Sequence, residues 1–279
     1  MDVSTLHLPV PDDEARPAAQ GSVFFVGNAT VLIRYGGFTI LTDPTFVHRH
    51  EKVSLGYGMS TTRLTDPAVD IADLPPLDLV LLSHFHGDHF DQVAQRDLDK
   101  TLPIVTTAQA ARELDELGFT RTQAVETWES IDVVKGPARV RITACPGRHG
   151  PGVSDLVLPD VMGSVLEFAP QGPEVTRRLY VSGDTLVYED LHEIPRRHPD
   201  LDVGLLHLGG TKVLGVMVTM DAEQGVEAMR IINPRLTLPV HYDDYDVFTS
   251  GLEEFLAEVD RAGLSDRVVG WGRGDTHPL

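Results

Sequence analysis

The sequence predicts a mixed α/β fold in which helices cover β-sheets and a polar site lies along one sheet edge. Three short segments rich in β-branched and aromatic residues follow one another within residues 22–42, separated by glycine-containing turns typical of hairpins. The last third of the chain instead alternates apolar strands with amphipathic helices. Ligand-type side chains recur where predicted strands end, and ligands gather at one such edge in helix-covered sheets.

The first predicted unit is a meander of three strands, at residues 22–26, 30–34 and 38–42. It ends at Asp43, which precedes a proline and is therefore either a turn former or an outer partner of a metal site. We expect residues 1–20 to form an N-terminal arm and residues 21–279 to form a single domain.

The remaining elements are predicted from apolar runs and helix signals. Further strands are expected at residues 77–82, 103–107, 124–128, 139–143, 161–168, 178–181, 201–208, 236–240 and 267–271. Helices are expected at residues 90–100, 108–117, 221–232 and 252–262. Thr107 is a plausible N-cap for the second helix, and Asp221 begins a capping-box pattern at the third.

Residues 45–76 show no periodicity, and a loop of that length inside a compact domain is more often functional than idle. Its His48 and His50 have no preceding apolar strand and no following carboxylate. We therefore expect these two histidines to be surface or substrate-side residues rather than metal ligands. This loop and residues 150–160 are expected to supply the pocket walls.

Composition and charge exclude several classes of function. The chain has 279 residues, of which 42% are hydrophobic, so it has ample material for a core. Its net charge of −19 argues against a nucleic-acid partner, because phosphate contacts need clustered Lys and Arg. The single cysteine, Cys145, excludes an internal disulfide. Without a long apolar run or a signal-peptide pattern, we expect a cytoplasmic protein with no stable membrane insertion, and the oligomeric state stays open, a homo-oligomer included.

The densest group of candidate ligands is the sequence HFHGDH at residues 84–89, directly after the apolar run at 77–82. Side chains two apart in an extended chain, such as His84 and His86, point the same way, and Gly87 lets the backbone bend beyond them. Imidazole and carboxylate suit zinc, manganese or iron, and so dense a cluster is costly to hold without a cation. A solvated, histidine-rich loop does not account for this spacing, so we interpret the turn as a metal site.

Four more ligand-type residues follow predicted strands: Asp43, His149, Asp184 and His241. The ordered set HxHxDH, His149, Asp184 and His241 resembles the metallo-β-lactamase superfamily over roughly residues 22–245. Stretches such as GNATVLI at residues 27–33 and PVHY at 239–242 resemble the branch of the ascorbate-6-phosphate lactonase and the N-acylphosphatidylethanolamine phospholipase D. The chain departs from that branch at Asn28, where histidine is frequent, and at His207, where proline is frequent.

The resemblance implies an α/β architecture of four layers, an αβ/βα sandwich with a metal site along one edge of its two sheets. It also implies a ligand set in which a first ion is held by His84, His86 and His149. The second ion would be held by Asp88, His89 and His241. Asp184 would bridge both ions.

Two divalent metal ions, zinc or manganese in the first place and iron as a further candidate, would activate a water for hydrolysis. The expected substrate is a small molecule with an ester, lactone or phosphodiester bond. Asp88 is the candidate for orienting that water or moving its proton. His207 beside the Gly209-Gly210 turn is either an acid or oxyanion donor, or a histidine packed in a buried strand.

Weaker candidates could contact a substrate. Lys212 and Arg148 could bind a substrate anion, and Tyr242 directly follows a candidate ligand. The alternative function is that of a mononuclear iron oxidoreductase of the persulfide-dioxygenase type on the same fold. The di-iron oxygen-reducing relatives carry glutamate at the position of His86, which argues against that class.

Overall fold

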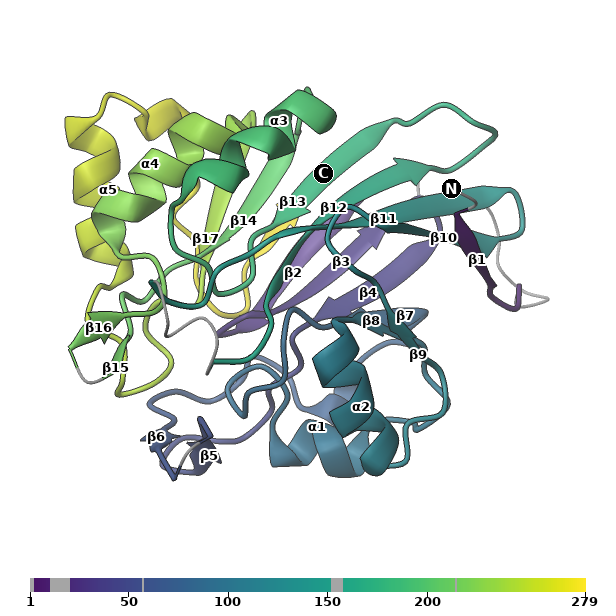
Figure 1. Cartoon of the computed structure of the whole chain (residues 1–279), viewed down its shortest axis with the longest axis horizontal. Helices are drawn as coiled ribbons and strands as arrows, with labels where there is room; N and C mark the ends of the chain where they lie inside the picture. Colours follow the sequence, from purple (N-terminus) through teal and green to yellow (C-terminus); the bar gives the residue numbers. More distant parts are fainter. Residues whose placement is uncertain (1–2, 11–20, 57, 152–157, 214) are drawn as a thin grey trace.

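The computed structural model describes residues 3–10, 21–56, 58–151, 158–213 and 215–279. Two seven-stranded sheets pack face to face, with α1 and α2 outside one sheet and α3, α4 and α5 outside the other (Figure 1). This is the predicted four-layer α/β architecture. Among the described residues, no helix is both long enough and apolar enough to cross a membrane.

The N-terminal sheet contains most of the first half of the chain. Its strands, in spatial order, are β18 (Thr276–Pro278), β2 (Ser22–Gly27), β3 (Thr30–Tyr35), β4 (Phe38–Thr42), β7 (Leu79–Leu81), β8 (Ile104–Thr106) and β9 (Thr122–Ala124). The predicted meander is antiparallel, whereas β4, β7, β8 and β9 run parallel. The C-terminal strand β18 closes the other edge by pairing with β2.

The second sheet contains the later strands and one strand from the N-terminus. Its strands, in spatial order, are β1 (Ser4–His7), β10 (Ser130–Lys135), β11 (Ala138–Pro146), β12 (Met162–Ala169), β13 (Arg177–Val181), β14 (Val203–His207) and β17 (Leu236–Val240). Part of the predicted arm at 1–20 is thus β1, which pairs in parallel with β10. Residues 1–2 and 11–20 of that arm lie outside the described residues.

Helices and two small hairpins complete the fold. The helices are α1 (Gln92–Asp97), α2 (Ala108–Glu116), α3 (Glu193–Arg197), α4 (Ala222–Ile232) and α5 (Leu252–Arg261). The hairpins are β5 (Lys52–Ser54) with β6 (Ser60–Thr62), and β15 (Lys212–Val213) with β16 (Val216–Met217). Both hairpins lie at the same end of the molecule (Figure 1).

Helix starts follow the predicted capping signals. The Thr107 side chain accepts a hydrogen bond from the Ala110 amide at the start of α2. The Asp221 carboxylate accepts one from the Gln224 amide at the start of α4. These side chains satisfy amide groups that a helix end otherwise leaves unpaired.

The apolar core lies on both sides of the N-terminal sheet, because several of its strands are buried on both faces. Leu79 and Leu81 of β7 belong to the core between the sheets, while Val80 belongs to the core under α1 and α2. Successive side chains of a strand point to opposite faces, so a continuous apolar run fills both layers. The strand predicted from the apolar run at residues 77–82 is therefore buried on both faces, as expected.

Two predicted boundaries and one predicted strand are wrong. Helix α1 ends at Asp97 rather than near residue 100, because Leu98 is extended and its side chain is buried in the core. The strand expected at 124–128 lies earlier, as β9, and Trp128 has a left-handed φ of 71°. The strand expected at 267–271 is absent among the described residues, where only Val268 forms a single β-bridge. That segment is held by the Trp271 indole, which donates to the Pro239 carbonyl at 2.7 Å.

The strand directions bring the candidate ligands to one edge. Strands β4 and β7 of one sheet are parallel, as are β13, β14 and β17 of the other. Strand β11 runs in the same direction as β13, since each is antiparallel to β12. The residues that lie at or just after these carboxyl ends are Asp43, the turn at 83–91, His149, Asp184, His207 and His241.

Candidate metal centre

The turn after β7 is shaped by a glycine and by the β5–β6 hairpin. The Gly87 amide donates to the Ser54 carbonyl at 2.9 Å, and a Cβ atom at Gly87 would lie 2.5 Å from that oxygen. A side chain at this position would therefore force the hairpin away. The turn then closes on itself, because the amides of His89 and Phe90 both donate to the His86 carbonyl.

Three histidines form the first group of candidate ligands. His84, His86 and His149 each offer a ring nitrogen, and these atoms lie within 4.8 Å of one another. His84 Nε2 is 3.2 Å from His86 Nδ1. His149 Nδ1 is 2.9 Å from the Val218 carbonyl, just after β16, which fixes the ring so that Nε2 is free for the group. We call these three residues the three-histidine group.

Two carboxylates and two histidines form the second group, which we call the carboxylate-rich group. It consists of Asp88, His89, Asp184 and His241, again with ligand atoms within 4.8 Å of one another. His89 Nε2 lies 3.3 Å from Asp184 Oδ2 and 3.2 Å from His241 Nε2. The rings of His84 and His89 have centroids 4.1 Å apart, so the two groups are neighbours.

Asp43 orients the carboxylate-rich group from behind. Its carboxylate accepts hydrogen bonds from the Ser83 amide at 2.7 Å and lies 3.2 Å from His89 Nδ1. A carboxylate at Nδ1 fixes the histidine tautomer and leaves Nε2 for a metal. The sequence allows two roles for Asp43, a turn former or an outer partner of a metal site. Its contact with the candidate ligand His89 favours the second role.

Two buried carboxylate oxygens indicate that these residues can bind a cation. Asp88 Oδ1 and Asp184 Oδ1 are buried and have no hydrogen-bond partner among the described residues. Buried carboxylate oxygens without partners are costly, and a divalent cation satisfies them. Carboxylates and imidazoles without a thiolate suit zinc, manganese and iron.

The two groups differ in their protonation. Burial lowers the pKa of His84 well below its usual value, lowers that of His86 to about 4, and also lowers that of His149. The three-histidine group is therefore neutral near pH 7, which leaves its ring nitrogens available as ligands.

In the carboxylate-rich group, charge pairing outweighs burial. Burial alone would lower the pKa of His89, but Asp184 and Asp88 raise it well above the usual value, and Asp184 likewise raises that of His241. The same pairs lower the pKa of Asp184 well below its usual range and also lower that of Asp88, against the effect of burial. Without a metal, these pairs favour the ionised form of the carboxylates and the protonated form of the imidazoles.

His207 is buried behind the site. Its Nδ1 lies 3.1 Å from Ser182 Oγ and its Nε2 lies 3.3 Å from Asp43 Oδ2. Both ring nitrogens are therefore within hydrogen-bonding distance of protein oxygens. The structure places this histidine against Asp43 and connects it to His89 through that carboxylate.

The predicted substrate residues have different surroundings. The Tyr242 hydroxyl donates to the Trp271 carbonyl at 2.6 Å, so it is already engaged in the core. The Arg148 guanidinium lies over the Tyr188 ring, 4.2 Å from its centroid. Lys212 is exposed on β15, in the hairpin that leads to Val218 and thus to His149.

The predicted pocket walls are described in part. The described residues of loop 45–76, which leave out residue 57, include Arg63, whose side chain is buried against Asp244 at 3.1 Å. His48 lies on the surface beside Asp66 and Asp70 and outside both candidate groups. The other wall, at 150–160, falls largely on residues 152–157, which lie outside the described residues.

Sequence reasoning missed Asp91 as a support of the site. This buried carboxylate caps α1 by accepting from the amides of Val93 and Ala94, and it also accepts from the Val47 amide at 2.6 Å. It thereby ties the start of loop 45–76 to the end of the HFHGDH turn. The capping signal before the helix was visible in the sequence, but the contact to Val47 was not.

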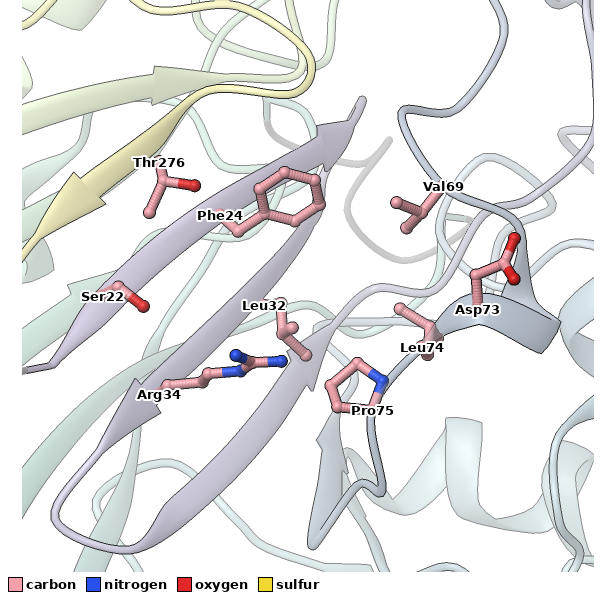
Figure 2. Close-up of a pocket in the computed structure, with 9 residues that line it drawn as sticks. All are labelled: Ser22, Phe24, Leu32, Arg34, Val69, Asp73, Leu74, Pro75 and Thr276. Carbon is pink, nitrogen blue, oxygen red and sulfur yellow. The ribbon is translucent and has the colours of Figure 1, made fainter. Parts of the chain in front are cut away.

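A separate surface pocket of about 260 Å³ lies on the outer face of β2 and β3 (Figure 2). Its apolar lining consists of Phe24, Leu32, Val69, Leu74 and Pro75. Arg34 and Asp73 add one charge of each sign, and no histidine lines it. The pocket shares no lining residue with the two ligand groups and offers no comparable metal-binding chemistry.

Comparisons with known proteins show the family of this chain. Residues 39–242 match the profile of the beta-lactamase superfamily domain. A UPF0173 metal-dependent hydrolase from Opitutus terrae is 30% identical over 205 residues, which cover 71% of this chain and 81% of that protein. The chain belongs to the metallo-β-lactamase superfamily and, within it, to the UPF0173 family of metal-dependent hydrolases.

Two solved structures share the fold at low sequence identity. A possible metal-dependent hydrolase from Veillonella parvula has a TM-score of 0.76 and 20% identity, with 94% of this chain and 100% of that chain covered. An isothiocyanate hydrolase from Delia radicum gut bacteria has a TM-score of 0.75 and 19% identity, with 92% and 98% covered. These likenesses establish the αβ/βα sandwich.

Proposed function

We propose that this protein is a two-metal hydrolase that acts on an ester, lactone or phosphodiester bond of a small molecule. The observation that carries the proposal is the adjacency of the three-histidine group and the carboxylate-rich group at one sheet edge. The first group would hold one cation and the second group the other. Asp184 would bridge the two, and two buried carboxylate oxygens without a hydrogen bond among the described residues favour cations at this place.

Two divalent cations would lower the pKa of a shared water, to about 7 in the case of zinc, and so supply a nucleophile at neutral pH. Asp88 suits the handling of the proton. Its pKa is lowered, so it is ionised near pH 7, and a carboxylate has two oxygens, one of which could bind the cation while the other accepts a proton. A carboxylate in this state can orient a water and take its proton.

His207 is proposed to act through Asp43 rather than on the substrate. Its Nε2 is directed to the carboxylate that also contacts His89. In this role His207 restrains Asp43, and Asp43 in turn restrains the ring of His89. Its engagement with Ser182 and Asp43 argues against the acid or oxyanion role.

Specificity is proposed to come from the two hairpins beside the groups. Hairpin β5–β6 contacts Gly87 of the turn, and hairpin β15–β16 leads to the carbonyl that holds His149. Lys212 on the second hairpin and Arg148 beside His149 place two cations in this region, which favours a substrate with an anionic group.

The alternative, an iron oxidoreductase of the persulfide-dioxygenase type, has less support. Curated relatives from several organisms carry the name metal-dependent hydrolase. A full set of seven ligand-type residues also exceeds the two histidines and one carboxylate that hold a single iron in such oxidoreductases.

A reconstitution assay tests the proposed function. Metal-free protein would be loaded with zinc or manganese and tested on lactones, carboxylate esters and phosphodiesters, with an isothiocyanate and a persulfide as further substrates. We expect metal-dependent hydrolysis of at least one ester-type class, lost in H86A and D184A and kept in D190A, which alters an exposed carboxylate. Full activity in H86A or D184A, or oxygen-dependent persulfide turnover with iron alone, would overturn the proposal.

A further inference from the structure

Asn28 lies in the turn between β2 and β3, at the same sheet edge as the candidate ligands. Its side chain is fully buried, and its φ of 54° is in the left-handed region that asparagine adopts more readily than most residues. Asn28 Nδ2 donates to the Asp88 carbonyl at 2.5 Å. The Asn28 carbonyl accepts from the His241 amide at 2.9 Å. One residue thus holds the backbone of two members of the carboxylate-rich group.

Asn28 is itself held from behind by a buried ion pair. Its amide donates to Asp244 Oδ2 at 2.7 Å, and Asp244 Oδ1 lies 3.1 Å from Arg63 Nη2. The Thr65 hydroxyl donates to the same Asp244 oxygen. Gly27 allows this approach, because a Cβ atom there would lie 2.8 Å from Arg63 Nη2. The turn at 27–28, loop 45–76 and the segment after His241 are therefore joined at one point.

The backbone at this point is constrained on both sides. His241 also has a left-handed φ, 61°, and its amide is bonded to the residue whose φ is 54°. Non-glycine residues keep such conformations only when their surroundings hold them. The three-histidine group depends on other contacts, from Ser83 to His84 and from the Val218 carbonyl to His149.

We propose that Asn28 is a positioning residue for the carboxylate-rich group. It sets the backbone of Asp88 and His241, and thereby the affinity for the second cation, without being a ligand itself. The inference rests on the proposed two-metal function. Asn28 Oδ1 is buried without a partner among the described residues, so the Nδ2 bond to Asp88 is the contact that fixes the side chain.

The test is the variant N28G, which permits the left-handed backbone and removes the side-chain bond. The chain offers a matched control in N233G, because Asn233 has the same φ of 54° but is exposed at the end of α4. Metal-free protein would be titrated with Co²⁺ and followed by visible absorption, with zinc competition against a chelator as a second readout. Thermal unfolding without metal would report whether each variant is folded.

We expect N28G to bind the first metal equivalent with the affinity of the unchanged protein. Its affinity for the second metal equivalent should be about 10–100-fold lower, the range typical of lost outer contacts in metal sites. N233G should bind both equivalents normally. The inference would be overturned if N28G bound both metal equivalents with unchanged affinity, or if both affinities fell by the same factor. If N28G does not fold, N28D removes the same Nδ2 donor at a residue type that also tolerates the left-handed φ, and it is judged by the same difference between the first and the second metal equivalent. An unchanged protein that binds no second equivalent would instead refute the two-metal function.

Discussion

The three-histidine group and the carboxylate-rich group lie side by side at one sheet edge, yet they differ in the charge that they bury. The first keeps its imidazoles neutral, because burial lowers their pKa values. The second buries two carboxylates and compensates them with raised imidazole pKa values. One half of the site is therefore ready for a cation, whereas the other must release protons to accept one.

The two groups also differ in the number of outer contacts that support them. The three-histidine group is supported by the Val218 carbonyl and by Ser83, whose hydroxyl also donates to Asp43. The carboxylate-rich group is backed by Asp43 and by the Asn28 turn, and through that turn by the Arg63–Asp244 ion pair. The half with buried charge thus needs the larger network, as expected when an unpaired buried charge is costly.

Loss of the bridging carboxylate should have the largest effect. D184A removes the partner of both His89 and His241, so we expect loss of the second equivalent, a weakened first equivalent and a fall in hydrolysis beyond the roughly 10–100-fold typical of outer contacts. H86A should weaken the first equivalent more than the second. Elemental analysis after dialysis measures both. If D184A and H86A lost the same metal equivalents, the two groups would not be separate cation sites.

Protons should compete with metal mainly in the carboxylate-rich group. Because Asp184 and Asp88 raise the pKa values of His89 and His241, protons compete with the second cation for these imidazoles at higher pH than at ordinary histidines, so the second affinity falls as pH falls. We expect roughly a tenfold change per pH unit for each displaced proton. The first affinity should be flatter, since the pKa of His86 is about 4. Calorimetry in buffers of different ionisation enthalpy counts the released protons; equal release by both equivalents would contradict the assignment.

D43N should weaken the second equivalent by about tenfold, the lower end of the range for outer contacts, and leave the first unchanged. The asparagine keeps the size of Asp43 but removes the charge beside His89. Chelator competition measures the affinities, with D190A as the surface control. An equal effect on both equivalents would show that Asp43 supports the fold rather than one group.

H207Q is expected to have the smallest effect, in the same direction as D43N. Because His207 contacts the group through Asp43, the double variant D43N/H207Q should be no weaker than D43N alone. Such non-additivity is expected of residues in one network. Additive losses in second-equivalent affinity would argue for a separate role of His207.

Much of the fold was predictable because its signals are local. Strands β4 and β17 have the predicted bounds, and the starts of α2 and α4 follow their capping residues. Strand β10 was missed although its residues alternate between buried and half-buried positions. The two-residue strands β15 and β16 carry almost no local signal, and their position depends on contacts with the rest of the fold.

The candidate ligands could be predicted because each follows a strand in a recognisable order. Their supports could not, because those are contacts between distant residues. Gly27-Asn28 carries the signal of an ordinary hairpin turn, yet the Asn28 amide bonds to Asp244, 216 positions away. Arg63 in an aperiodic loop gave no indication of burial. The direction of Tyr242 into the core likewise depends on Trp271, which only the folded chain brings near.

The most direct test of the central claim is the metal content of the protein purified without added metal, measured by elemental mass spectrometry. The two groups predict about two equivalents of zinc or manganese per chain. One equivalent of iron would favour the oxidoreductase alternative. No metal, with none taken up on titration, would contradict the interpretation of the HFHGDH turn and its partners as a metal centre.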